Sequence, residues 1–148
     1  MKRICVAIDF SDVTPVVIEK AIELAKKFEA QVKVIHIDYL MPVLNYYGVD
    51  QIYTVEAYEA QKERNKKLLE EIMEDFEKNK LKAESQLIEG NVVEGIIATA
   101  EDFEADLIIV GAHSHGKLYH IFFGCIHEAL INKAFCPILV VPKHEEEQ

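Results

Sequence analysis

Three of the chain's six glycines lie close together in the stretch LIIVGAHSHGKLYHIFFGC, which begins at Leu107. They are Gly111, Gly116 and Gly124, and they fall between a strongly apolar segment and a predicted helix. Glycine lets backbone N–H groups approach a phosphate closely, and a helix N-terminus adds partial positive charge. The stretch therefore indicates an anion-binding turn. A turn with unusual dihedral angles and tight helix packing would explain the same glycines.

The segment GAHSHGKL matches the phosphate-binding pattern G-x-x-x-x-G-K-[ST] at every position except the last, where Leu118 replaces a hydroxyl. Leucine cannot ligate magnesium, and no later apolar strand ends in the aspartate that would give the metal its second anchor. We therefore interpret this match as accidental. A weak ATPase or phosphotransfer activity that depends on Lys117 stays open as a third hypothesis.

Four histidines occur in or just after the same stretch, but no cysteine or carboxylate completes a ligand spacing that would favour a metal site. They are His113, His115, His120 and His127. His36 lies in a predicted strand, where we expect a hydrogen-bonded structural residue rather than a catalytic base.

Composition excludes several classes of protein. The 148 residues carry a formal net charge of −10 and present no basic face, so nucleic-acid binding is disfavoured. Three cysteines without C-x-x-C spacing, and a start that does not resemble a signal peptide, predict a cytoplasmic location. No apolar run approaches the roughly 20 residues that cross a bilayer, so we expect no membrane insertion.

Predicted strands and helices alternate along the chain. We expect strands at residues 3–8, 31–38, 82–90, 106–112 and 136–142, and helices at 13–28, 52–80, 91–104 and 126–134, with Thr14 and Asn91 as caps. This order predicts an α/β fold, a three-layer doubly wound domain whose five-stranded, mainly parallel sheet has helices on both faces. We expect one domain over residues 1–142 and an acidic tail over 143–148.

In such a fold, ligands bind beyond the carboxyl ends of the strands, where the direction of winding reverses. If the first and fourth strands are neighbours, Asp9 and Gly111 face one crevice. The sequence alone does not establish that pairing.

The chain resembles the universal stress protein family along nearly its whole length. The likeness rests on VAIDFSD, VIHID, GAHSHGKLYHIFFGC and KAFCPILVVP, which start at Val6, Val34, Gly111 and Lys133. It implies a fold like that of the adenine nucleotide alpha hydrolases. It also implies an adenine nucleotide, ATP or AMP, as ligand, with no metal other than magnesium carried by the nucleotide.

The resemblance also assigns the phosphate end of the site. Nucleotide-binding members share the pattern G-x2-G-x9-G-[ST], which falls on Gly111, Ser114, Gly124 and Cys125, so two of four positions depart from it. Gly116 lies between them. Ser114 in place of glycine costs about 1 kcal/mol of binding free energy if the site needs a left-handed backbone there. Cys125 in place of a hydroxyl residue loses roughly 1–3 kcal/mol of hydrogen bonding to the phosphates. Together they predict binding weakened roughly ten- to a thousandfold.

The resemblance also implies that the residues which contact adenosine are present in this chain. Asp9 matches the family's acidic residue after the first strand, Ala7 lies beside it, and Ile37 matches the position whose backbone meets adenine. Val110 and Ile126 complete the expected site.

Our leading hypothesis is therefore a non-enzymatic stress-response regulator that binds adenine nucleotide weakly. By resemblance, it forms a homodimer through the last strand, from Pro137 to Val141. The alternative is a nucleotide-independent dimeric interaction protein of the same fold.

Overall fold

A computed structural model of the chain describes residues 1–38, 55–112 and 126–143. Five strands form one sheet in which every pairing is parallel, in the order β3-β2-β1-β4-β5. They are β1 (Arg3–Ile8), β2 (Gln31–Asp38), β3 (Ala83–Glu89), β4 (Leu107–Ala112) and β5 (Ile138–Pro142). The predicted doubly wound fold is confirmed. Because the chain winds outward from β1 to β3 and then returns to β4 beside β1, the winding reverses between β1 and β4.

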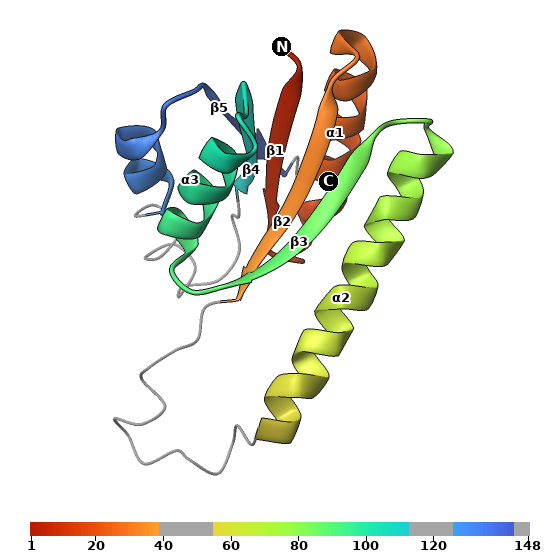
Figure 1. Ribbon diagram of the computed structural model, residues 1–148, viewed down its shortest axis with the longest axis vertical. Helices are drawn as coiled ribbons and strands as arrows, with labels where there is room; N and C mark the ends of the chain where they lie inside the picture. The colour runs from red at the N-terminus through yellow and green to blue at the C-terminus, as the bar shows by residue number, and fades with distance from the viewer. Residues whose placement is uncertain (39–54, 113–125, 144–148) are drawn as a thin grey trace, which may run out of the picture.

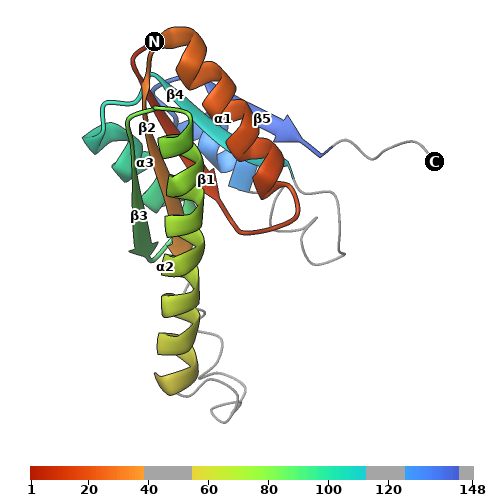
Figure 2. The ribbon, with the colours of Figure 1, turned by 90° about the vertical axis from the view of Figure 1, so that its right-hand side faces the viewer.

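Helices cover both faces of the sheet (Figure 1). α1 (Thr14–Phe28) and α2 (Val55–Lys78) lie on one face, and α3 (Val92–Asp102) lies on the other with a helical segment at residues 126–133. α2 precedes β3 in the sequence, and its first turns extend beyond the carboxyl ends of β2 and β3 (Figures 1 and 2). None of the helices in the described ranges has the length and apolar character to span a membrane.

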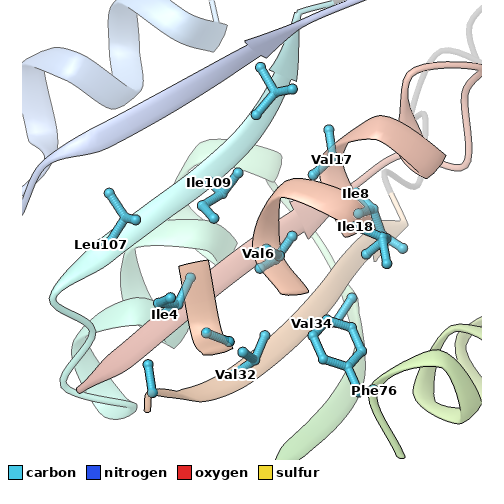
Figure 3. Packing of buried hydrophobic residues seen from close by; sticks show 14 of the residues in the cluster. Ile4, Val6, Ile8, Val17, Ile18, Val32, Val34, Phe76, Leu107 and Ile109 are labelled. Atoms are coloured by element: carbon cyan, nitrogen blue, oxygen red, sulfur yellow. The ribbon is translucent and has the colours of Figure 1, made fainter. Parts of the chain in front are cut away.

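The sheet separates two apolar clusters, because successive side chains of a strand point to opposite faces. In β1, Ile4, Val6 and Ile8 belong to the cluster under α1 and α2, while Cys5 packs under α3. Figure 3 shows the first cluster, where side chains of β1, β2 and β4 meet those of α1 and Phe76 of α2. Strands buried on both faces explain the nearly continuous apolar runs in the sequence.

The two predicted helix caps had different outcomes. Asn91 caps α3 as expected, since its side chain accepts a hydrogen bond from the Glu94 N–H at 3.0 Å. The Thr14 cap was wrong: Val13 holds the N-cap position, and Thr14 is the first helical residue. Thr14 Oγ1 is buried and has no hydrogen-bond partner among the described residues.

The last strand is shorter than predicted. It begins at Ile138 rather than at Cys136. Pro137 has no N–H to donate to a strand ladder, although its carbonyl accepts a hydrogen bond from the Ile108 N–H at 3.0 Å. Pro137 therefore bounds β5 instead of belonging to it.

Candidate functional site

A pocket of about 160 Å³ lies at the carboxyl ends of β1, β2 and β4. The first turns of α1 and α3 and the start of the 126–133 helix supply its remaining walls. Its position is the point where the winding reverses, because the chain leaves β1 toward one face of the sheet and returns to β4 past the other. The fifteen lining residues are Ala7, Ile8, Asp9, Val13, Thr14, Val17, His36, Ile37, Val92, Ile96, Val110, Gly111, Ile126, His127 and Leu130.

Six of the ten site residues predicted from the sequence line this pocket: Ala7, Asp9, Ile37, Val110, Gly111 and Ile126. The expected neighbourhood of Asp9 and Gly111 is therefore present, because β1 and β4 are hydrogen-bonded neighbours. Ser114, Gly116, Gly124 and Cys125 lie outside the described residues.

Asp9 is the carboxylate of the pocket. It directly follows β1, is exposed to solvent, and its Oδ1 accepts a hydrogen bond from the Ser11 N–H at 3.0 Å. Its other oxygen makes no hydrogen bond with any described residue. A carboxylate held by one oxygen can accept hydrogen bonds from ligand hydroxyl or amino groups through the other.

The wall formed by the strands is apolar. Ala7 on β1 is paired with Ile35 of β2 and Val110 of β4. Ile37 lies two residues further along β2, and Ile96 of α3 packs in the same cluster. Ile37 and Val110 are both buried. Small and branched apolar side chains facing one exposed carboxylate are typical of sites that bind a flat apolar group with a polar edge.

Gly111 serves packing in this pocket. A Cβ at this position would lie 2.6 Å from Val13 Cγ1 and 3.1 Å from Val17 Cγ2, so at least the Val13 side chain would have to shift. Gly111 is not left-handed; among the described glycines, only Gly90 has a positive φ. Of the two explanations for this glycine, tight helix packing is directly observed. Its carbonyl also accepts a hydrogen bond from His127 Nε2 at 3.1 Å, which links β4 to the 126–133 helix.

His36 is the hydrogen-bonded residue that its strand position predicted. Its Nδ1 lies 2.8 Å from the Ile8 carbonyl and its Nε2 lies 2.9 Å from Asp38 Oδ1. Asn65 of α2 donates to the same Asp38 oxygen at 3.0 Å. Sequence analysis missed Asp38 and Asn65. The i, i+2 spacing of His36 and Asp38, which places both on one face of a strand, was the available signal.

Cysteine and metal chemistry find little support in the described part of the chain. Burial raises the pKa of the Cys5 thiol to about 12, so this thiol stays protonated and unreactive. Within the described ranges, no three His, Cys, Asp or Glu side chains are grouped closely enough to hold a metal ion.

Comparison with known proteins agrees with this fold. The model of the universal stress protein family matches residues 1–142. The chain belongs to the universal stress protein family. Universal stress protein MJ0531 of Methanocaldococcus jannaschii is 32% identical over 147 residues, which cover 99% of this chain and 85% of the relative.

Solved structures of family members share the architecture. The structure of MJ0577 of Methanocaldococcus jannaschii has a TM-score of 0.80 at 24% identity and covers 98% of each chain. A universal stress protein from Archaeoglobus fulgidus in complex with dAMP has a TM-score of 0.64 at 23% identity, covering 95% of this chain and 98% of the other. Another member, in complex with cAMP, has a TM-score of 0.65 at 16% identity and covers 95% of each chain.

Proposed function

We propose that this universal stress protein is a cytoplasmic, non-enzymatic regulator that binds adenine nucleotide weakly in the pocket between β1 and β4. The observation that carries the proposal is the meeting of Ala7, Asp9 and Ile37, the adenosine positions, with Gly111 and Ile126 in one pocket. The two family members in complex with dAMP and cAMP support the same class of ligand.

Each part of the pocket suits one part of the nucleotide. The apolar wall of Ala7, Ile37 and Val110 accepts a flat base, and the free oxygen of Asp9 accepts hydrogen bonds from ribose hydroxyls. The phosphates belong on the side of Gly111 and Ile126, where the sequence places Ser114 and Cys125. Magnesium, if present, arrives with the nucleotide.

Calorimetric titration with ATP tests the proposal. We expect heat of binding at millimolar ATP, and a loss of roughly tenfold or more in affinity for Asp9→Ala, because a hydrogen bond to a charged group contributes about 1.5–3 kcal/mol. Asp102→Asn is the matched control, since Asp102 is an exposed carboxylate on α3 with no side-chain hydrogen bond to a described residue. Absence of binding at millimolar ATP would remove nucleotide binding from the proposal.

A double variant tests the assigned phosphate positions. Ser114→Gly combined with Cys125→Ser restores the family pattern, and we expect it to bind ATP roughly ten- to a thousandfold more tightly than wild type. If the double variant binds no better, the assignment of these two positions is wrong.

A homodimer through the last strand is the second part of the proposal, and it would also serve the nucleotide-independent alternative. β5 is an edge strand, and edge strands present unpaired backbone groups. Three of the six exposed large hydrophobic residues in the described ranges occur in β5, between it and the preceding helix, or on that helix: Val140, Phe135 and Ile131, respectively.

Sedimentation velocity tests the dimer. Val140→Lys is expected to shift the protein from dimer to monomer, whereas Val55→Lys, at a more exposed apolar position on α2, is expected to leave the dimer intact. A Val140→Lys protein that remains dimeric would place the interface elsewhere. A dimer that never binds ATP would favour the nucleotide-independent alternative.

A further inference from the structure

The His36 side chain is held on three sides at the edge of the pocket. Its two ring nitrogens contact Ile8 O and Asp38 Oδ1, and its ring packs against Phe10 with 4.5 Å between centroids. The side chain of His36 is 12% exposed and that of Asp38 is 17% exposed, so water has little access to these hydrogen bonds.

Two of these contacts flank Asp9. Ile8 precedes it and Phe10 follows it, and Phe10 has a φ of 58°, a left-handed conformation that bulky residues rarely adopt. Such a conformation persists only where surrounding contacts hold it. The His36 ring therefore fixes the backbone on both sides of the carboxylate, whose Oδ1 then accepts the Ser11 N–H.

This arrangement requires a proton between His36 and Asp38. A carbonyl oxygen only accepts, so Nδ1 must donate its hydrogen to Ile8. Nε2 then faces a carboxylate oxygen at 2.9 Å, and this contact is a hydrogen bond only if one of the two atoms carries a proton. When that proton leaves, the neutral ring has one N–H for two acceptor oxygens, so a nitrogen lone pair faces either the Asp38 carboxylate or the Ile8 carbonyl and that contact becomes repulsive.

Helix α2 supports the pair from the other side. Asn65, only 3% exposed, donates to Asp38 Oδ1 and accepts a hydrogen bond from Gln61 Nε2 at 3.2 Å. The titratable and charged groups around the pair are Asp9 after β1, His127 on the 126–133 helix, Tyr58 and Lys62 on α2, and Glu89 on β3. α1 and α3 present only Val13, Thr14, Val17, Val92 and Ile96 to the pocket.

We propose that His36 is a positioning residue, which holds Asp9 in the geometry that receives the ligand only while the His36–Asp38 pair keeps its proton. The effect on binding rests on the proposed nucleotide function. Affinity for nucleotide then falls as pH rises, by up to about tenfold per pH unit, the limit for one coupled proton.

Two substitutions of Asp38 separate positioning from mere stability. In Asp38→Asn, the amide can donate to a neutral Nε2 or, turned over, accept from a protonated one, and the amides of Asn65 and Gln61 can turn with it. This variant is expected to hold His36 at every pH. Asp38→Ala removes the partner and is expected to release His36 at every pH.

The first test needs no ligand. The backbone amide signals of Asp9, Phe10 and Ser11 are followed by NMR from about pH 5.5 to 9, around the range where histidine ordinarily changes charge. We expect them to move in one step in wild type and to stay fixed in Asp38→Asn. Wild-type signals that do not move, or signals that move equally in both proteins, would overturn the proposal.

The second test uses ATP over the same pH range. Wild type is expected to match Asp38→Asn at low pH and Asp38→Ala at high pH, while ionisation of the ATP phosphates affects all three proteins alike. Identical pH profiles for wild type and Asp38→Asn would overturn the coupling. If none of the three proteins binds ATP, the proposed nucleotide function fails, and the amide signals still decide whether His36 positions Asp9.

Discussion

At Gly111 the backbone of β4 lies so close to α1 that a methyl group does not fit. The two side chains that would collide with it, Val13 and Val17, belong to the buried cluster that holds α1 on the sheet. The same residue lines the pocket. Helix packing and pocket shape therefore depend on one missing side chain.

Gly111→Ala is expected to destabilise the protein by about 1–3 kcal/mol, the usual cost of overpacking. Urea unfolding measures it, and Val13→Ala provides the partner variant because it removes the nearer colliding methyl group. The double variant should lose less stability than the sum of the two single variants, since the positions are in contact. Strict additivity would show that the collision with Val13 is not the cause.

Asp106 ties the start of β1 to the start of β4. Its Oδ2 accepts the backbone N–H groups of Lys2 and Arg3 at 2.6 and 2.9 Å, and these hydrogen bonds hold the pKa of the carboxyl below its usual value. A lowered folded-state pKa stabilises the fold above the unfolded pKa of about 4, and this contribution disappears as pH falls through the folded-state pKa.

Asp106→Asn is therefore expected to lower the melting temperature at neutral pH, and the difference from wild type should shrink as the pH falls below about 4. Thermal unfolding followed by circular dichroism at several pH values measures this. Asp102→Asn again serves as the control and should show no such convergence. A difference that stays constant with pH would contradict the role given to the carboxylate.

The sequence identified some residues of the site and missed others. Asp9 was identified because its position after the first strand matches a family pattern, and His36 because an alternating strand left it a polar position. Asp38 and Asn65 complete the network from another part of β2 and from α2. Their contact depends on how α2 packs on the sheet, which local spacing does not specify.

Among the elements, α2 depends most clearly on a few buried positions. Its sequence is strongly charged, and only Asn65, Leu69 and Phe76 are buried. Phe76 is 1% exposed and packs in the cluster beneath α1 and α2 (Figure 3). The attachment of α2 therefore rests largely on Leu69 and Phe76 rather than on the exposed ion pair between Lys62 and Glu89 of β3.

Phe76→Ala is expected to cost about 3–5 kcal/mol of stability, because it removes a fully buried aromatic side chain. Glu77→Ala, at the adjacent exposed position, should change stability by no more than about 0.5 kcal/mol. Urea midpoints with unchanged slopes give both values. Equal effects of the two substitutions would show that Phe76 does not anchor α2.

Elements were predictable where a single local signal dominates. β1 is a continuous apolar run between polar residues, and its predicted bounds match Arg3–Ile8. α1 was located but its cap was not, because both Val13 and Thr14 stand where a helix can begin and the surrounding loop decides between them. The start of β5 was misplaced because an apolar run continues through Pro137, which cannot donate to the ladder.

At the scale of the whole molecule, the order of the strands in the sheet brings the residues of the pocket together. Alternating elements predicted a parallel doubly wound sheet, but not that β1 lies between β2 and β4, since several strand orders satisfy the same alternation. That neighbourhood brings Asp9, Ile37 and Gly111, which lie far apart in the sequence, to one pocket. The proposed nucleotide site depends on this arrangement rather than on any one motif.

Mapping ATP onto the protein by NMR tests this central claim most directly. We expect the backbone signals of Ala7, Asp9, Ile37, Val110 and Gly111 to shift together as ATP is added, because these residues share the pocket at the carboxyl ends of three strands. The opposite ends of the same strands, at Arg3, Gln31 and Leu107, should remain unchanged. Shifts confined to those opposite ends, or to β3, would contradict a nucleotide site between β1 and β4.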